Sequence, residues 1–152
     1  MFCGSAAGRA SALKGAYYAG PGNMFWPTLA KVGLTPRRLA PEEFRRLPDF
    51  GLGLTDLCKS VSGADAELPR GADDPEALRD KIQRFQPDTL AFVGKRPARV
   101  VLGRTPGYGP HAECIGATRL YVLPSPSGAA RRYWDETWWW DLARAAGPGG
   151  EA

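Results

Sequence analysis

Two apolar runs bounded by turn residues stand out in the second half of the chain. Residues 89–93, TLAFV, end at Gly94, and residues 119–123, RLYVL, end at Pro124. Short apolar runs closed by Gly or Pro are typical of buried strands. The opening residues, MFC, lead into the turn-like GSAAG. They predict the end of a third strand, which we expect to be truncated at its start.

Four other segments combine apolar positions at helical spacing with capping signals: residues 25–32, 41–47, 74–85 and 131–145. Gly33 follows the first of them as a C-terminal cap, and Asp74 opens the third as an N-cap. Residues 98–102 form a helix or a strand, because their periodicity fits both. The remaining polar or glycine-rich stretches predict loops: residues 50–56, 59–74 and 103–117.

This alternation predicts an α/β fold, a three-layer α/β/α domain around a central, mainly parallel sheet of four or five strands. We expect the domain to span residues 1–146 and a flexible tail to follow at 147–152. Ligands bind beyond the carboxyl ends of strands in such sheets. The loops GSAAG, GKRPA and PSPSG each leave a strand, so we expect them to share one edge.

Composition and charge narrow the function classes only slightly. The 152 residues carry a net charge of +4, three cysteines and one histidine. No Cys/His cluster has the spacing of a metal site, so we expect no structural zinc or iron–sulfur site. The sequence has neither an apolar run of about 18 residues nor the layout of a signal peptide. We therefore expect a cytoplasmic, monomeric protein without membrane association. We also expect His111 on the surface and at least two of the tryptophans 138–140 in the core.

Six sequence blocks carry a resemblance to a known family. They are FCGSAAGRASA, YYAGPGNMFWPTL, GLTPRRLAPEEF, GLGLTDL, PDTLAFVGK and YVLPSPSGAA. In their order and spacing they resemble the uracil-DNA glycosylase superfamily, most closely its mismatch-specific (thymine/uracil) branch. The resemblance implies a DNA partner and cleavage of the N-glycosidic bond of a flipped-out uracil, without metal or cofactor.

The resemblance also implies roles for individual residues. Tyr18 is expected to stack on the extruded base, with Tyr17 as the substitute if the loop is shifted by one. Backbone N–H groups of Ser5, Ala6 and Tyr18 are expected to bind the uracil carbonyls. Asn23 is expected to hydrogen-bond the base or, equally, to hold the turn. The candidates for DNA contact are Gly8, Ser11, Lys59, Ser125, Pro126, Ser127, Gly128 and Arg131.

The first block departs from the family pattern. Ala6 stands where the mismatch-specific branch usually has a catalytic Asn, and alanine cannot orient a water. Either the activity is lost or another side chain supplies it. Asp56 in GLGLTDL is the best candidate, because a carboxylate can stabilise an oxocarbenium ion and position or deprotonate water. The alternative for Asp56 is a helix N-cap or an Asx turn.

The last block departs as well, with Ser125 where the family usually has Asn. Ala129 and Ala130 follow and are weak wedges for a duplex, whereas Arg131 and Arg132 can hold phosphates. We therefore expect excision of uracil from single strands or from several base pairings, rather than strict dependence on a G mismatch.

Two other function classes stay open. Ala6 also fits a catalytically weak or inactive protein that binds uracil or lesions in DNA. A nucleotide- or nucleoside-processing α/β enzyme is the third class, although the sequence has neither a P-loop nor a GxGxxG motif.

Overall fold

The computed structural model describes residues 1–6, 11, 15–58 and 72–147. A five-stranded sheet with the order β2-β1-β3-β5-β4 forms its centre. The strands are β1 (Phe2–Gly4), β2 (Leu54–Asp56), β3 (Thr89–Val93), β4 (Gly109–Ile115) and β5 (Thr118–Leu123). All neighbours pair in parallel except β4, which pairs antiparallel with β5 at one edge. The predicted α/β class with a mainly parallel sheet is confirmed.

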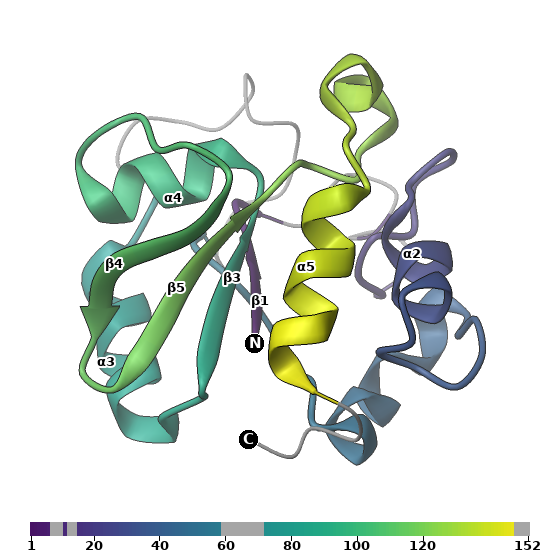
Figure 1. Cartoon of the computed structure of the whole chain (residues 1–152), viewed down its shortest axis with the longest axis horizontal. Coiled ribbons are helices and arrows are strands. Elements are labelled where there is room, and N and C mark those ends of the chain that lie inside the picture. Colours follow the sequence, from purple (N-terminus) through teal and green to yellow (C-terminus); the bar gives the residue numbers. More distant parts are fainter. Residues whose placement is uncertain (7–10, 12–14, 59–71, 148–152) are drawn as a thin grey trace.

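Helices cover both faces of this sheet (Figure 1). On one side lie α3 (Pro75–Phe85) and α4 (Lys95–Leu102), and on the other lie α2 (Phe25–Lys31) and α5 (Thr137–Ala146). The 3-10 helix η1 (Pro41–Phe50) packs on the side of α2 and α5. A second 3-10 helix, η3 (Gly128–Tyr133), projects from the molecule between β5 and α5. The chain therefore has the three-layer α/β/α arrangement that its sequence predicts.

Strand β3 shows why its sequence is apolar throughout. Leu90 and Phe92 pack with α3 and α4, whereas Ala91 and Val93 pack with α2 and α5. Successive side chains of a strand point to opposite faces, so a strand covered on both faces needs apolar residues at every position. The buried runs in the sequence are thus the central strands of the sheet.

Local signals set the helix ends as predicted. The Asp74 carboxylate accepts a hydrogen bond from the backbone N–H of Ala77 at 3.0 Å, so Asp74 is the N-cap of α3. Gly33, with φ +84°, follows the end of α2. The undecided run 98–102 is helical, as part of α4, which ends at Gly103 with φ +74°.

Four predicted segments are wrong in type or extent. Residues 54–56 form β2 instead of a loop, and residues 109–115 form β4, which contains His111. Both are edge strands with backbone pairing, and much of β4 is solvent-exposed, so neither has the apolar pattern of a central strand. The helix predicted at 41–47 is the longer η1, whose interior Pro48 does not fit an α-helix. The predicted helix 131–145 begins only at Thr137, because Trp134 is extended after η3.

The tryptophan run divides as expected. Trp139 is fully buried, Trp138 packs partly against the same core, and Trp140 is 36% exposed. His111 is half-buried, with Nε2 2.9 Å from the carbonyl oxygen of Gly107. In the described part of the chain, no helix is long and apolar enough to cross a membrane.

Candidate active site

The carboxyl ends of the four parallel strands meet at one edge of the sheet. Gly4 at the end of β1 lies opposite Asp56 at the end of β2, and the backbone N–H of Leu57 donates to the carbonyl of Gly4 at 2.8 Å. The N–H of Gly94, after β3, donates to the carbonyl of Leu123, the last residue of β5, at 2.9 Å. The loops that follow these strands therefore start at a shared edge, as the sequence predicts.

Asp56 is a buried carboxylate at this edge. Only 8% of the residue is exposed, and it ends β2, so that Leu57 and Cys58 after it are not helical. The helix-cap alternative for Asp56 is therefore wrong. A methyl group added at Gly4 would lie 3.1 Å from Oδ1 of Asp56 and 3.1 Å from the hydroxyl of Tyr18. The two oxygens can be no further apart than twice that distance.

Tyr18 is held in an unusual state. Its φ of +52° is rare for a residue other than glycine. Its ring stacks on Phe25, with centroids 4.1 Å apart and planes inclined by 26°. Its hydroxyl is buried and has no hydrogen-bond partner among the described residues. Burial, and then the nearby charge of Asp56, raise the pKa of Tyr18 well above its usual value, so the phenol stays protonated.

Tyr17 points elsewhere. Its ring packs edge-on against Phe44 of η1 with centroids 5.3 Å apart, and its carbonyl accepts a hydrogen bond from the indole N–H of Trp26. Tyr18, and not Tyr17, therefore lies beside Asp56.

The loop before α2 and the loop after β5 are joined. The backbone N–H of Met24 donates to the carbonyl of Pro126 at 2.9 Å. A methyl group at Gly128 would lie 3.4 Å from the carbonyl oxygen of Pro21, so the small residue allows this close approach. The Arg131 guanidinium lies over Gly22, 2.9 Å from the position of a Cβ there. The structure thus brings residues 21–24, which include the predicted base-binding residue Asn23, beside residues 126–131, which include predicted DNA contacts.

Several predicted contact residues also hold these loops together. Asn23 Oδ1 accepts from the N–H of Phe25 at 2.9 Å, so its alternative role of holding the turn is observed. The hydroxyls of Ser125 and Ser127 accept from backbone N–H groups two residues ahead. Ser11 is buried, and its hydroxyl accepts from the N–H of Ala19 at 2.8 Å. Contacts of these residues with base or DNA stay predictions.

The glycine-rich loop after β1 is described only at its start. Ser5 is buried, and its carbonyl accepts from the N–H of Cys58 at 2.7 Å, whereas Ala6 is half-buried. Gly8 and Lys59 lie outside the described residues. Ser5 and Ala6, whose N–H groups are predicted to bind the base, follow the end of β1 and so lie at the same edge of the sheet as Asp56.

Two residues of the site were missed from the sequence. Gly4 resembles an ordinary turn glycine after a strand, and Phe25 fits the apolar face of α2. Their roles come from three-dimensional contacts, since Gly4 leaves room for Asp56 and Tyr18 and Phe25 backs the Tyr18 ring. The only sequence signal is the position of both residues beside the glycine-rich loops.

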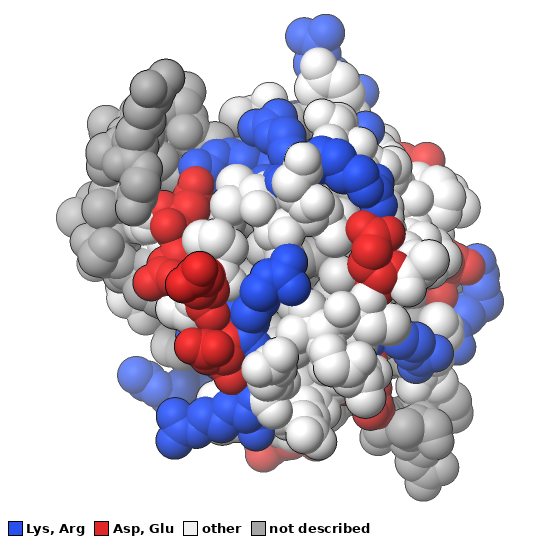
Figure 2. All heavy atoms as spheres, turned by 90° about the vertical axis from the view of Figure 1, so that its left-hand side faces the viewer, with Lys and Arg blue, Asp and Glu red and all other residues white. Residues whose placement is uncertain are grey.

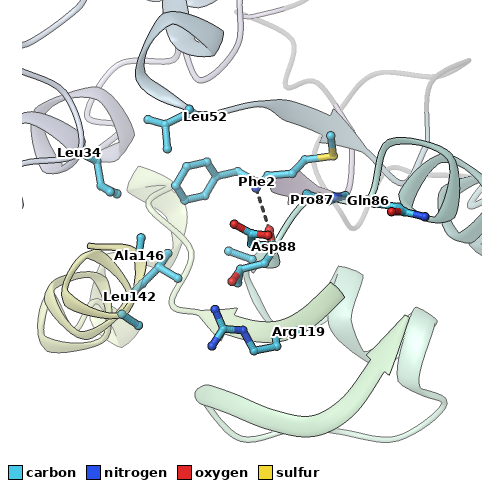
Figure 3. A pocket seen from close by; sticks show the side chains of 14 residues that line it. Phe2, Leu34, Leu52, Gln86, Pro87, Asp88, Arg119, Leu142 and Ala146 are labelled. Carbon is cyan, nitrogen blue, oxygen red and sulfur yellow. Dashed lines mark hydrogen bonds between the residues drawn. The ribbon is translucent and has the colours of Figure 1, made fainter. Parts of the chain in front are cut away.

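A cavity of about 360 Å³ lies at the opposite edge of the sheet (Figure 3). Leu34, Leu52 and Leu142 line one side of it, and Asp88 and Arg119 lie on another. Its lining includes the first residues of β1 and β3 and none of the predicted site residues. The cavity is therefore separate from the cluster around Asp56.

Within residues 1–6, 11, 15–58 and 72–147, no group of three or more His, Cys, Asp or Glu side chains is placed to hold a metal ion. The polar groups that lie close together at the carboxyl edge are instead the Asp56 carboxylate and the Tyr18 phenol. Such a set can bind a polar ring and assist a reaction of water.

The comparison with known families agrees with this geometry. The family model described as the Uracil DNA glycosylase superfamily matches residues 1–144, which include all five strands and the loops of the carboxyl edge. Membership indicates a DNA glycosylase of base excision repair, a hydrolase that acts on DNA. The chain belongs to the uracil DNA glycosylase superfamily.

Proposed function

We propose that this protein is a monofunctional uracil-DNA glycosylase, which hydrolyses the N-glycosidic bond of a flipped-out uracil and leaves an abasic site. One observation carries the proposal. The Asp56 carboxylate and the Tyr18 hydroxyl lie equally close to the vacant side-chain position of Gly4, at the edge where this fold binds ligands.

Base binding falls to Tyr18. Extruding a base from a duplex costs about a few kcal/mol, and stacking on an aromatic ring recovers about 1–3 kcal/mol. Phe25 covers one face of the Tyr18 ring, and the base would stack on the other face. The strained backbone of Tyr18 supports this role, because such strain persists where the surrounding structure imposes it and clusters at functional sites.

Asp56 supplies the chemistry in this proposal. The bond between C1′ and N1 breaks and its electron pair leaves with the uracil, so the sugar acquires oxocarbenium character. The buried carboxylate stabilises that positive charge. A water then attacks C1′ and transfers a proton to Asp56. Asp56 passes this proton on to the departing uracil, so that the products are free uracil and an abasic sugar. Asp56 thereby takes the part that Ala6 cannot perform.

The Tyr18 hydroxyl adds a hydrogen-bond donor. A buried hydroxyl without a partner is costly unless a ligand or water completes it. Because its raised pKa keeps it protonated, the hydroxyl donates to the attacking water.

The loop after β5 affects the preference between single-stranded and duplex DNA. Ser125 and Ala129 offer neither a two-sided amide nor a large wedge, whereas Arg131 and Arg132 offer charge for phosphates. We therefore propose excision from single strands and from several pairings. A marked preference for G·U over A·U and single-stranded substrate would contradict this part.

The test of the function is release of uracil from a labelled oligonucleotide under single-turnover conditions. Asp56→Asn keeps the shape but removes the charge, and we expect its rate to fall by about 10²–10⁴-fold. Asp88→Asn is the matched control, because Asp88 is an exposed carboxylate at the opposite edge. Equal rates for wild type and Asp56→Asn would remove Asp56 from the mechanism.

A second candidate function is a lesion-binding protein that does not cleave. The alanine at position 6 favours it, since that side chain has no atom to orient water. Wild-type protein that binds uracil-containing DNA tightly and releases no uracil would establish this function and exclude the first.

A further inference from the structure

Two aromatic residues with cations over their rings, the exposed Tyr133 and the half-buried Tyr108, lie beside the candidate active site. The guanidinium of Arg132 lies 5.1 Å from the centroid of the Tyr133 ring on η3. The ammonium of Lys95 lies 4.5 Å from the centroid of the Tyr108 ring. We call these four residues the aromatic–cation patch. Of the four, only Arg132 has a part in the function proposed above, as a charge for phosphates.

The fold brings the two pairs together. Lys95 follows Gly94. A Cβ added at Gly94 would lie 3.5 Å from Cβ of Ser125, in the loop that leads to η3. Tyr108 precedes Gly109, where an added Cβ would lie 2.8 Å from the ring of Trp138, near the start of α5. Burial first, and then the nearby Tyr133 and Asp135, raise the pKa of Tyr108, which agrees with this proximity. The patch therefore flanks the loop of residues 125–128 at the carboxyl edge.

Exposure and charge make the patch available to a nucleic acid. Tyr133 is 59% exposed, one of the most exposed large apolar residues in the described part of the chain, and Lys95 is exposed. Figure 2 shows Lys and Arg side chains on the upper part of the face that carries α4 and again lower on it, with a block of acidic side chains between them. The nearby Asp135 carboxylate accepts a hydrogen bond from the N–H of Thr137 at 3.0 Å and so serves the start of α5.

We propose that the aromatic–cation patch binds unpaired nucleotides that flank the target uracil in single-stranded DNA. Aromatic rings interleaved with cations suit this ligand, because unpaired bases stack on the rings while the cations attract the phosphates. Paired bases are already stacked on one another and gain nothing from Tyr133. The inference rests on the proposed function for the position of the target base, and it explains how a site with weak wedge residues favours unpaired DNA.

The chain offers a matched control at the other edge of the sheet. Phe85 is 63% exposed, and the guanidinium of Arg84 lies 5.6 Å from its ring centroid. Like Tyr133, Phe85 is an exposed aromatic residue with a cation over its ring. It ends α3, just before β3 begins, and therefore lies far from the carboxyl edge. A loss of DNA affinity on substitution of Tyr133, but not of Phe85, would therefore depend on the position of the ring and not on exposed aromatic area alone.

The experiment measures binding of fluorescein-labelled oligothymidine, which contains no uracil, by fluorescence anisotropy. We expect Tyr133→Ala to raise Kd about tenfold, Tyr133→Phe to stay within about twofold of wild type, and Phe85→Ala to stay at wild-type affinity. A fully paired duplex should bind wild type and Tyr133→Ala equally. Wild-type affinity of Tyr133→Ala for oligothymidine, or equal losses on both DNAs, would overturn the proposal.

Because these DNAs contain no uracil, the result does not depend on catalysis. Failure of the proposed function would appear as wild-type protein that releases no uracil, whatever its affinity for oligothymidine. Failure of the patch would appear as unchanged binding by Tyr133→Ala, whatever the rate of excision.

Discussion

The two edges of the sheet differ in how their polar groups are satisfied. At the amino edge, the Met1 amino group donates to the carbonyl of Thr89 at 2.8 Å, and the Met1 carbonyl accepts from the N–H of Ala91. At the carboxyl edge, Asp56 is buried beside a partnerless hydroxyl on a strained Tyr18. The cavity lies at the first edge, and the candidate catalytic groups lie at the second. Backbone strain occurs at both edges, since Gln86 in the cavity lining has a φ of +48°. The buried, unpartnered hydroxyl of Tyr18 beside the buried Asp56 is therefore what distinguishes the carboxyl edge.

The largest expected effect on this contrast comes from substituting one glycine at each edge. In Gly4→Ala the new methyl would press on both Asp56 and Tyr18, whereas in Gly53→Ala the nearest atom is 3.7 Å away, on the Met1 side chain. We expect uracil release to fall about 100-fold in Gly4→Ala, since a small displacement of a reacting group has effects of this size. Single-turnover rates measure the effect, and Gly53→Ala should match wild type. If Gly4→Ala retains full activity, the close approach at Gly4 has no catalytic importance.

A second test compares a tyrosine without a partner and one with a partner. Tyr121 donates to the carboxylate of Asp141 at 2.6 Å, whereas the Tyr18 hydroxyl has no partner in the described part of the chain. We expect Tyr121→Phe to lower the free energy of unfolding by about 1–2 kcal/mol and Tyr18→Phe to raise it by about 1 kcal/mol. Tyr18→Phe should also slow uracil release. Urea denaturation measures the stabilities, and a loss of stability in Tyr18→Phe would show that its hydroxyl is satisfied.

The smallest expected effect is on thermal stability, and it concerns an ion pair that lies at neither edge of the sheet. Hydrogen bonds from Arg37 and from the N–H of Ala40 lower the pKa of Glu43 to about 2, below its usual value of 4.5. A lowered pKa stabilises the fold above the usual value, and this stabilisation is lost as pH falls from about 4.5 through about 2. Glu43→Gln should therefore show a smaller drop in Tm over this range than wild type, although the pair is exposed and the effect small. Thermal melts check this, with Glu42→Gln on the same helix as control, and an identical drop in wild type and Glu43→Gln would refute it.

What the sequence predicts depends on how local each signal is. The central strands 89–93 and 118–123 and the cap at Asp74 follow from apolar runs and one short polar side chain. The edge strands 54–56 and 109–115 form through pairing with distant segments, so their own patterns do not reveal them. In the site, the sequence blocks predict which loops meet. The strain of Tyr18, its unpartnered hydroxyl and the space at Gly4 depend on packing between β1, β2 and the loop before α2.

The hydrogen bond between Met24 and Pro126 has a consequence for which damaged bases fit. It ties the segment that follows Tyr18 to the segment that precedes η3. A larger base can then be admitted only if both loops move together, because neither can open alone without breaking that bond. Size selection among lesions would therefore be a property of the pair of loops, and variants that free one loop should widen the range of accepted bases.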